Sequence, residues 1–160
     1  MNPKYPIYII SKGRANSCLT ARELSAMNVD FFLVVEPQEF DEYNLIWGDK
    51  CSIIQTPFSN LGNGSIDVRN FVLDTSTKNG DKRHWILDDN LEGFHRLHQN
   101  EKYNVSDGTI FKCAEDFTDR FTNVGLSGMN YYSFCKATSK ISPFYLNTRI
   151  YSCILVNNSI

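Results

Sequence analysis

Short apolar runs alternate with longer mixed stretches over the first 90 residues of this 160-residue chain. The short runs have the length of strands and show no regular polar alternation, as is typical of strands that are covered on both faces. They lie at residues 7–10, 31–35, 52–55 and 85–87. The stretches between them have the length of helices. The helices expected there span residues 18–27, 37–46 and 65–77.

Local signals mark the ends of these helices. Asn16 or Ser17 can cap the first helix. Pro37 can open the second, because its missing N–H is not needed in the first turn, and Asn79-Gly80 ends the third. A repeated order of strand, loop and helix predicts βαβ units, and therefore an α/β domain with a mostly parallel sheet flanked by helices.

The pattern is less regular after Asn90. Residues 95–110 are polar, which is typical of a hairpin or of a mobile loop over a site. Farther along, we expect a helix at residues 111–121 and two strands at residues 131–134 and 150–156.

Composition and charge narrow the class of protein. Hydrophobic residues make up 42% of the chain, and 16 basic against 18 acidic residues give a net charge of −2. This balance argues against a broad basic surface for nonspecific nucleic-acid binding. The five cysteines and three histidines lack the spacing of a zinc site, and no apolar stretch approaches membrane-spanning length. We therefore expect a soluble cytoplasmic protein that makes no contact with a membrane.

Two carboxylates and an amide follow the buried run before residue 88. Asp88, Asp89 and Asn90 stand where that strand ends, and ligands of α/β sheets bind at the carboxyl ends of the strands. Carboxylate oxygens there suit Mg²⁺ or Mn²⁺ held against a phosphate-bearing ligand. An Asp-Asp-Asn turn or a helix cap explains the same residues without a ligand.

Basic side chains occur near the same expected edge. Lys12 and Arg14 flank Gly13 in the loop after the first strand, where they suit a phosphate or form an ordinary solvated loop. Arg69 and Asn70 lie among apolar neighbours on the third helix, so we expect both to be partly exposed. An arginine in that position pairs with a ligand phosphate or with a carboxylate such as Asp67 or Asp74.

The order of these segments resembles a known family. The similar segments are Pro6–Ala15, the loop with Gly62 and Gly64, Arg69-Asn70-Phe71, Arg83–Asn90 and, later, residues 128–132 and 147–153. Together they cover most of residues 6–158 and resemble the TET/JBP-associated glycosyltransferases, a GT-A-fold group found largely in bacteriophages. The resemblance implies a GT-A-like, Rossmann-type sheet that binds a nucleotide-sugar. It also implies sugar transfer to a modified base in DNA, such as 5-hydroxymethylcytosine, in the host cytoplasm if the protein is phage-encoded.

The resemblance also assigns roles to individual residues. Asp88 and Asp89 would bind the metal, Mn²⁺ or Mg²⁺, and Asp88 would also contact the donor, a nucleoside-diphosphate sugar such as a UDP-sugar. The other donor contacts would be Lys12, Arg14 and Arg69 around the nucleotide-sugar, Asn70 near the sugar or ribose, and Gly128 and Asn130 along the donor-sugar or acceptor side.

One feature departs from the family. In the family the chain continues after the last strand into a segment that completes the acceptor site, whereas no carboxylate follows Asp119 here. We therefore expect residues 1–160 to form one nucleotide-sugar-binding domain that lacks this segment. A complementing chain or a second copy would then supply it, or the protein is a fragment or an inactive regulatory module.

A third class of function is a metal-dependent nucleotidyltransferase that uses the same aspartates. Such enzymes usually need further carboxylates on a neighbouring strand. The expected strands at residues 131–134 and 150–156 contain none, which disfavours this class.

Overall fold

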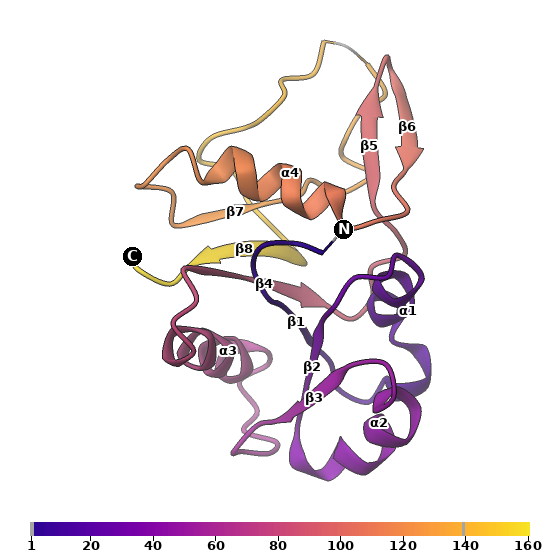
Figure 1. The fold of residues 1–160 in the computed structure, drawn as a ribbon, viewed down its shortest axis with the longest axis vertical. Coiled ribbons are helices and arrows are strands. Elements are labelled where there is room, and N and C mark those ends of the chain that lie inside the picture. The colour runs from indigo at the N-terminus through magenta and orange to yellow at the C-terminus, as the bar shows by residue number, and fades with distance from the viewer. Residues whose placement is uncertain (1, 139) are drawn as a thin grey trace.

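A six-stranded sheet runs through the centre of the computed structural model, which describes residues 2–138 and 140–160 (Figure 1). Its strand order is β3-β2-β1-β4-β8-β7. The first four strands are parallel, β8 is antiparallel to β4, and β7 is antiparallel to β8. The strands are β1 (Ile7–Ile10), β2 (Phe32–Val35), β3 (Ser52–Gln55), β4 (Arg83–Asp88), β7 (Leu126–Gly128) and β8 (Cys153–Asn157). The predicted α/β class with a mostly parallel, Rossmann-like sheet is confirmed.

The helices follow the strands much as the sequence predicts. Two short 3-10 turns precede the first two helices: η1 (Ala15–Ser17) and η2 (Pro37–Glu39). The α-helices are α1 (Leu19–Ala26), α2 (Phe40–Trp47), α3 (Ile66–Lys78) and α4 (Thr109–Thr118). Pro37 thus opens the 3-10 turn, and α2 begins three residues after it. The fourth helix begins before the predicted residue 111 and ends before residue 121.

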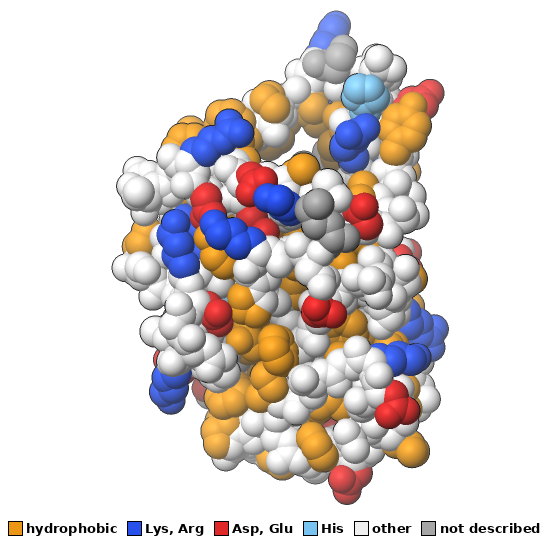
Figure 2. Space-filling model, in the orientation of Figure 1, with side chains coloured by type: hydrophobic (Ala, Val, Ile, Leu, Met, Phe, Trp, Pro, Cys, Tyr) orange, Lys and Arg blue, Asp and Glu red, His pale blue; other side chains and the backbone are white. Residues whose placement is uncertain are grey.

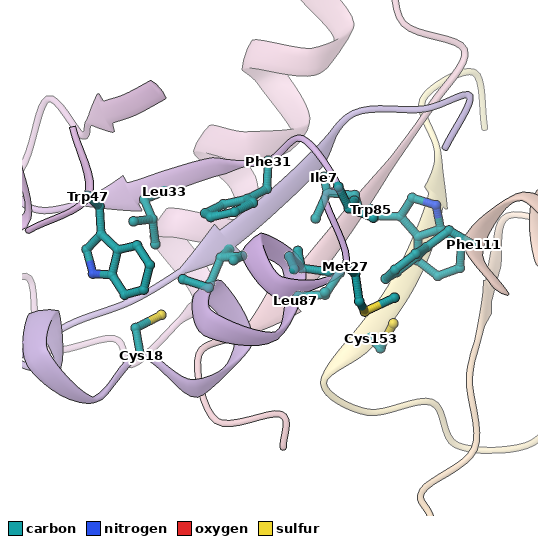
Figure 3. Close-up of a cluster of buried hydrophobic side chains, with 14 of the residues drawn as sticks. Ile7, Cys18, Met27, Phe31, Leu33, Trp47, Trp85, Leu87, Phe111 and Cys153 are labelled. Atoms are coloured by element: carbon teal, nitrogen blue, oxygen red, sulfur yellow. The ribbon is translucent and has the colours of Figure 1, made fainter. Parts of the chain in front are cut away.

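Alternation along the buried strands sends side chains to two cores, one on each face of the sheet. Ile7 and Ile9 of β1 belong to the larger core, whereas Tyr8 and Ile10 belong to the smaller one. Residues of α1, α2 and α4 cover the first face, and α3 covers the second. Figure 3 shows the first core, with Trp47, Phe31, Trp85 and Phe111 along the sheet. The result is a three-layer arrangement in which both faces of the parallel strands are covered.

In the segment after β4, the structure confirms one expectation and corrects another. Residues 95–110 include a hairpin of β5 (His95–His98) and β6 (Glu101–Asn104), one of the two predicted alternatives. Residues 131–134 do not form the predicted strand, and residues 132–134 form a turn, because Tyr131 instead stacks on the distant Tyr151, with ring centroids 5.6 Å apart. Leu126–Gly128 pairs with β8 in their place.

The last strand starts later than predicted. Residues 150–156 were expected to be extended, but β8 begins at Cys153. Ser152 has a φ of 56°, in the left-handed region, and this interrupts an extended conformation directly before the strand. Over the described residues, no helix combines the length and apolar character that crossing a membrane requires.

Candidate functional site

The carboxyl ends of the four parallel strands meet at one edge of the sheet. Because β8 is antiparallel to β4, its amino-terminal end lies at the same edge. A cavity of about 320 Å³ opens there, lined by Ile10, Lys12, Arg14, Asp88, Asp89 and Asn90. Lys12, Arg14, Asp88 and Asp89 were predicted as site residues from the sequence, and the fold brings these four together.

Asp88 is the last residue of β4 and interacts with α3 and with the residue that precedes β8. The guanidinium of Arg69 donates to its Oδ1 at 2.6 Å, and the hydroxyl of Ser152 donates to its Oδ2 at 2.7 Å. The backbone N–H of Asp88 also donates to the carbonyl of Ser152 at 2.9 Å. A third of the Asp88 side chain, 33%, remains exposed. Arg69 therefore pairs with Asp88, and not with either helical carboxylate considered from the sequence.

Asp89 instead fixes the loop that follows β1. Its Oδ2 accepts from the hydroxyl of Ser11 at 2.7 Å, and its Oδ1 accepts from Arg14 Nη1 at 2.9 Å. The hydroxyl of Tyr43 lies 2.6 Å from Ser11 Oγ and accepts from the backbone N–H of Arg14 at 3.0 Å. Only 12% of the Asp89 side chain is exposed, against 50% of the Arg14 side chain. The two adjacent aspartates thus differ: Asp88 is open to the cavity, and Asp89 anchors its wall.

Lys12 is held by a carboxylate that sequence reasoning missed. Its ammonium donates to both oxygens of Glu36 at 2.8 Å and to Asn60 Oδ1 at 2.8 Å. Burial alone would raise the pKa of the Glu36 carboxyl, but hydrogen bonds from Lys12 and Gln38 lower it overall. Glu36 directly follows β2, so the rule that locates Asp88 at a strand end also indicates Glu36.

Ser152 is the second residue that sequence reasoning missed. It combines the positive φ of 56° with hydrogen bonds to Asp88 Oδ2 and to the hydroxyl of Tyr131. A non-glycine residue in the left-handed region is uncommon, and such residues cluster at functional sites. No local pattern identifies it, because its place at this edge follows from the antiparallel direction of β8.

Four predicted donor-site residues lie outside the cavity lining: Arg69, which contacts the lining residue Asp88, and Asn70, Gly128 and Asn130. Asn70 is exposed on α3, so the expectation that apolar neighbours would partly cover it was wrong. Gly128 lies in β7 opposite Ile154, where a Cβ atom would collide with the carbonyl of Cys153, so glycine permits close pairing of β7 with β8. Asn130 is exposed just after β7. Their assignment to a donor remains a prediction.

The oxygen donors at this edge fit a cation that is shared with a phosphate ligand. A carboxylate offers about four lone-pair sites, and Asp88 uses two of them for Arg69 and Ser152. Mg²⁺ is usually bound by one or two carboxylates together with substrate phosphates. No group of three or more His, Cys, Asp or Glu side chains suited to a metal occurs among the described residues. The residues therefore fit a cation whose coordination shell is completed by the ligand, and Asp88 is the carboxylate that is accessible to it.

A covered Rossmann-like sheet with acidic and basic side chains around a cavity at its carboxyl edge places this chain among the α/β proteins whose ligand sites lie at the carboxyl ends of the strands. Within this class the sequence is specific. Residues 5–160 match the TET-Associated Glycosyltransferase family, and the chain belongs to that family. The predicted resemblance is thus confirmed, and the family is one of glycosyltransferases. A comparison with curated proteins gives no match.

Proposed function

We propose that this protein transfers a sugar from a nucleoside-diphosphate sugar, most simply a UDP-sugar, to a hydroxymethylated pyrimidine in DNA. The main support for this proposal is the cavity at the sheet edge, which Asp88 lines together with Lys12 and Arg14. Arg14 uses one of its five N–H donors on Asp89, so others remain for a phosphate. The proposal places the protein in the cytoplasm, where nucleotide-sugars and DNA are both accessible.

Charge balance at the edge supports a role for a divalent cation. Each basic side chain is already paired with a carboxylate: Lys12 with Glu36, Arg14 with Asp89, and Arg69 with Asp88. A bound diphosphate would therefore add negative charge without a free cation to offset it. Asp88, with Asp89 behind it, would hold Mn²⁺ or Mg²⁺, which when bound would neutralise charge on the departing diphosphate.

In the proposed reaction, the hydroxymethyl oxygen of the base bonds to the anomeric carbon and releases its proton to water. The bond from that carbon to the diphosphate breaks, and its electron pair leaves with the diphosphate oxygen. Lys12 and Arg14 orient the diphosphate, and Arg69 keeps the Asp88 carboxylate in place. A base inside a duplex is out of reach of such a cavity, so the acceptor must be extruded or single-stranded. A complementing chain or a second copy that supplies further acceptor residues remains part of the proposal.

Calorimetric titration tests the donor half of this proposal. UDP should bind with Mn²⁺ present and bind at least about tenfold more weakly in EDTA, because a bridging cation contributes on the order of a few kcal/mol. Asp88→Asn should abolish the Mn²⁺ dependence. Asp74→Asn, an exposed aspartate on α3, is the matched control and should titrate like the unchanged protein. Equal UDP binding in Mn²⁺ and EDTA would contradict the metal role, and absence of UDP binding in both would contradict the donor.

Turnover separates the enzyme from the alternative, an inactive or split donor-binding module. The protein is incubated with UDP-glucose, Mn²⁺ and single-stranded DNA containing 5-hydroxymethylcytosine, and the digested nucleosides are analysed by mass spectrometry. A glycosylated nucleoside supports the transferase. Metal-dependent UDP binding without any glycosylated product, across a panel of UDP-sugars, would favour the donor-binding module.

A further inference from the structure

The last quarter of the chain carries basic residues but no acidic ones. Of the 16 Lys and Arg residues, Arg120, Lys136, Lys140 and Arg149 follow Asp119, whereas none of the 18 Asp and Glu residues does. The net charge of −2 therefore conceals a segment of about +4 attached to an acidic remainder. In Figure 1 this segment runs over α4 and past the β5–β6 hairpin before it returns as β8.

The same segment exposes aromatic side chains, which we call the aromatic cluster: Tyr131, Tyr132, Phe134 and Tyr151. Tyr132 is 57% exposed, Phe134 64% and Tyr151 43%. Tyr131 joins them, since it stacks on Tyr151 and meets Phe134 edge-on at 5.5 Å between centroids. Figure 2 shows hydrophobic together with Lys and Arg side chains in the upper part of the molecule. Contiguous exposed apolar surface of this kind can mark a binding site.

The hairpin adds two cationic or titratable side chains to the cluster. Lys102 Nζ lies 3.8 Å from the ring centroid of Tyr132 and donates to the Tyr132 carbonyl. The ring of His95 meets Tyr132 at 4.7 Å between centroids. Across residues 2–138 and 140–160, no ion pair joins Lys102, Lys136 or Arg149 to a carboxylate. Lys102 thus stands beside an aromatic face, and Lys136 and Arg149 are each two residues in sequence from an aromatic residue of the cluster.

The cluster borders the cavity at the sheet edge through a short hydrogen-bonded path. The hydroxyl of Tyr131 bonds the hydroxyl of Ser152, which donates to Asp88 Oδ2 at 2.7 Å. Ser152 is adjacent to Tyr151, so the exposed ring of Tyr151 also lies next to this path. The cluster is therefore linked through Ser152 to Asp88, which lines the cavity.

We propose that the aromatic cluster, with Lys102, Lys136 and Arg149, binds a single-stranded or extruded stretch of nucleic acid. Bases of any sequence stack on aromatic rings, and unpaired Lys and Arg side chains attract the backbone phosphates. A second copy of the chain is a poorer occupant, because it would bring the same uncompensated positive charge against itself. That the bound strand presents the acceptor base rests on the proposed function, whereas strand binding itself does not.

Fluorescence anisotropy with a labelled single-stranded deoxyoligonucleotide, in the absence of nucleotide, tests the proposal. Phe134→Ala and Tyr151→Ala should each weaken binding about tenfold through lost stacking. Lys136→Glu with Arg149→Glu should weaken it at least about tenfold at low salt and flatten its salt dependence. Leu45→Ala on α2, where the residue is 86% exposed, and Lys78→Glu at the end of α3 are matched controls that should bind within about twofold of the unchanged protein.

Several results would overturn the proposal. These are an absence of single-strand binding, equal weakening by Lys78→Glu, or unchanged binding in both aromatic variants that keep the native circular dichroism spectrum. A concentration-dependent dimer that Phe134→Ala dissociates without changing DNA binding would assign the cluster to self-association. UDP titration of the same variants keeps the two proposals apart: loss of DNA binding with intact UDP binding concerns this cluster alone, and the reverse result concerns the donor site alone.

Discussion

Each end of strand β4 carries an Arg–Asp ion pair, but the two pairs differ in how far the arginine side chain is exposed to solvent. At its carboxyl end Asp88 pairs with Arg69, whose side chain is 30% exposed. At its amino end Arg83 pairs with Asp119, and only 1% of the Arg83 side chain is exposed. Chemistry alone therefore does not separate a binding site from a structural contact. The access of solvent to the charged groups separates them.

The amino end of β4 is held by a network of hydrogen bonds around Arg83. Arg83 Nε donates to Asp119 at 3.1 Å, and Arg83 Nη1 donates to the carbonyl of Val124 at 3.1 Å. Asp119 also accepts from the hydroxyl of Tyr5 at 2.7 Å and from the ammonium of Lys4. These contacts tie the amino-terminal segment and α4 to β4. Because only 1% of the Arg83 side chain is exposed, this network stabilises the fold around β4.

A second buried carboxylate strengthens the same end. Glu115 is 0% exposed and accepts from Trp85 Nε1 at 2.8 Å and from the backbone N–H groups of Lys4 and Tyr5 at 2.8 and 3.2 Å. At the carboxyl end, by contrast, Asp88 and Arg14 keep unused donors and acceptors that face a cavity. We infer that a candidate site is indicated by unused hydrogen-bond donors and acceptors at a solvent-accessible ion pair, and not by the ion pair itself.

Substitution of one aspartate at each end of β4 should give the largest difference in the free energy of unfolding. Asp119→Asn should lower the free energy of unfolding by about 3 kcal/mol, because it leaves the buried Arg83 charge without its partner. Asp88→Asn should change it by less than about 1 kcal/mol, because water reaches Arg69. Urea denaturation of the two variants measures both values. Equal losses would show that the two ends of β4 do not differ in the way that burial indicates.

Acidification should destabilise the protein because Asp119, which pairs with Arg83 at the amino end of β4, becomes protonated. Burial tends to raise the pKa of Asp119, but hydrogen bonds from Lys4 and Tyr5 lower it to about 2 from an ordinary value of 3.8. A depressed carboxyl pKa stabilises the fold above the unfolded value, so this contribution, about 2 kcal/mol, is lost as the pH falls from about 4 toward 2.

The measurement is the free energy of unfolding of the unchanged protein and of Asp119→Asn between pH 5 and about pH 2.5. Their difference should shrink as Asp119 protonates. His84 also favours unfolding in acid, because burial lowers its pKa, but it is common to both proteins and cancels in the difference. A difference that stays constant over this range would contradict the assignment to Asp119.

The sequence predicted the repeating half of the fold well because its signals are local. The expected strands and helices up to β4 occur within a few residues of their predicted bounds. The prediction failed at residues 131–134, where aromatic residues suggested a strand but pack against Tyr151. Packing between residues 20 positions apart overrides local β preference there.

The sequence predicted which residues gather at the site better than it predicted their hydrogen-bond partners. Asp88 and Asp89 stand at a strand end, so their position followed from topology. Their separate roles did not, because these depend on partners that come from other elements: Arg69 and Ser152 for Asp88, and Arg14 for Asp89. Ser152 is 64 positions from Asp88 in sequence, and only the antiparallel return of β8 brings it there.

Substitution of Asp89 should lower the free energy of unfolding by less than substitution of Asp119 and by more than substitution of Asp88. Asp89 lies at the open edge, yet its side chain is only 12% exposed and holds Ser11 and Arg14. Asp89→Asn keeps one acceptor oxygen but removes the charge, so we expect a loss of about 1 kcal/mol in the free energy of unfolding. The loop at residues 11–14 should also exchange its backbone amide hydrogens faster, because Arg14 loses its charged partner. Hydrogen-exchange mass spectrometry measures this effect, with Asp88→Asn as the control that leaves exchange in this loop unchanged. Faster exchange in the Asp88 variant instead would reverse the assignment of Asp89 as the anchor and Asp88 as the open carboxylate.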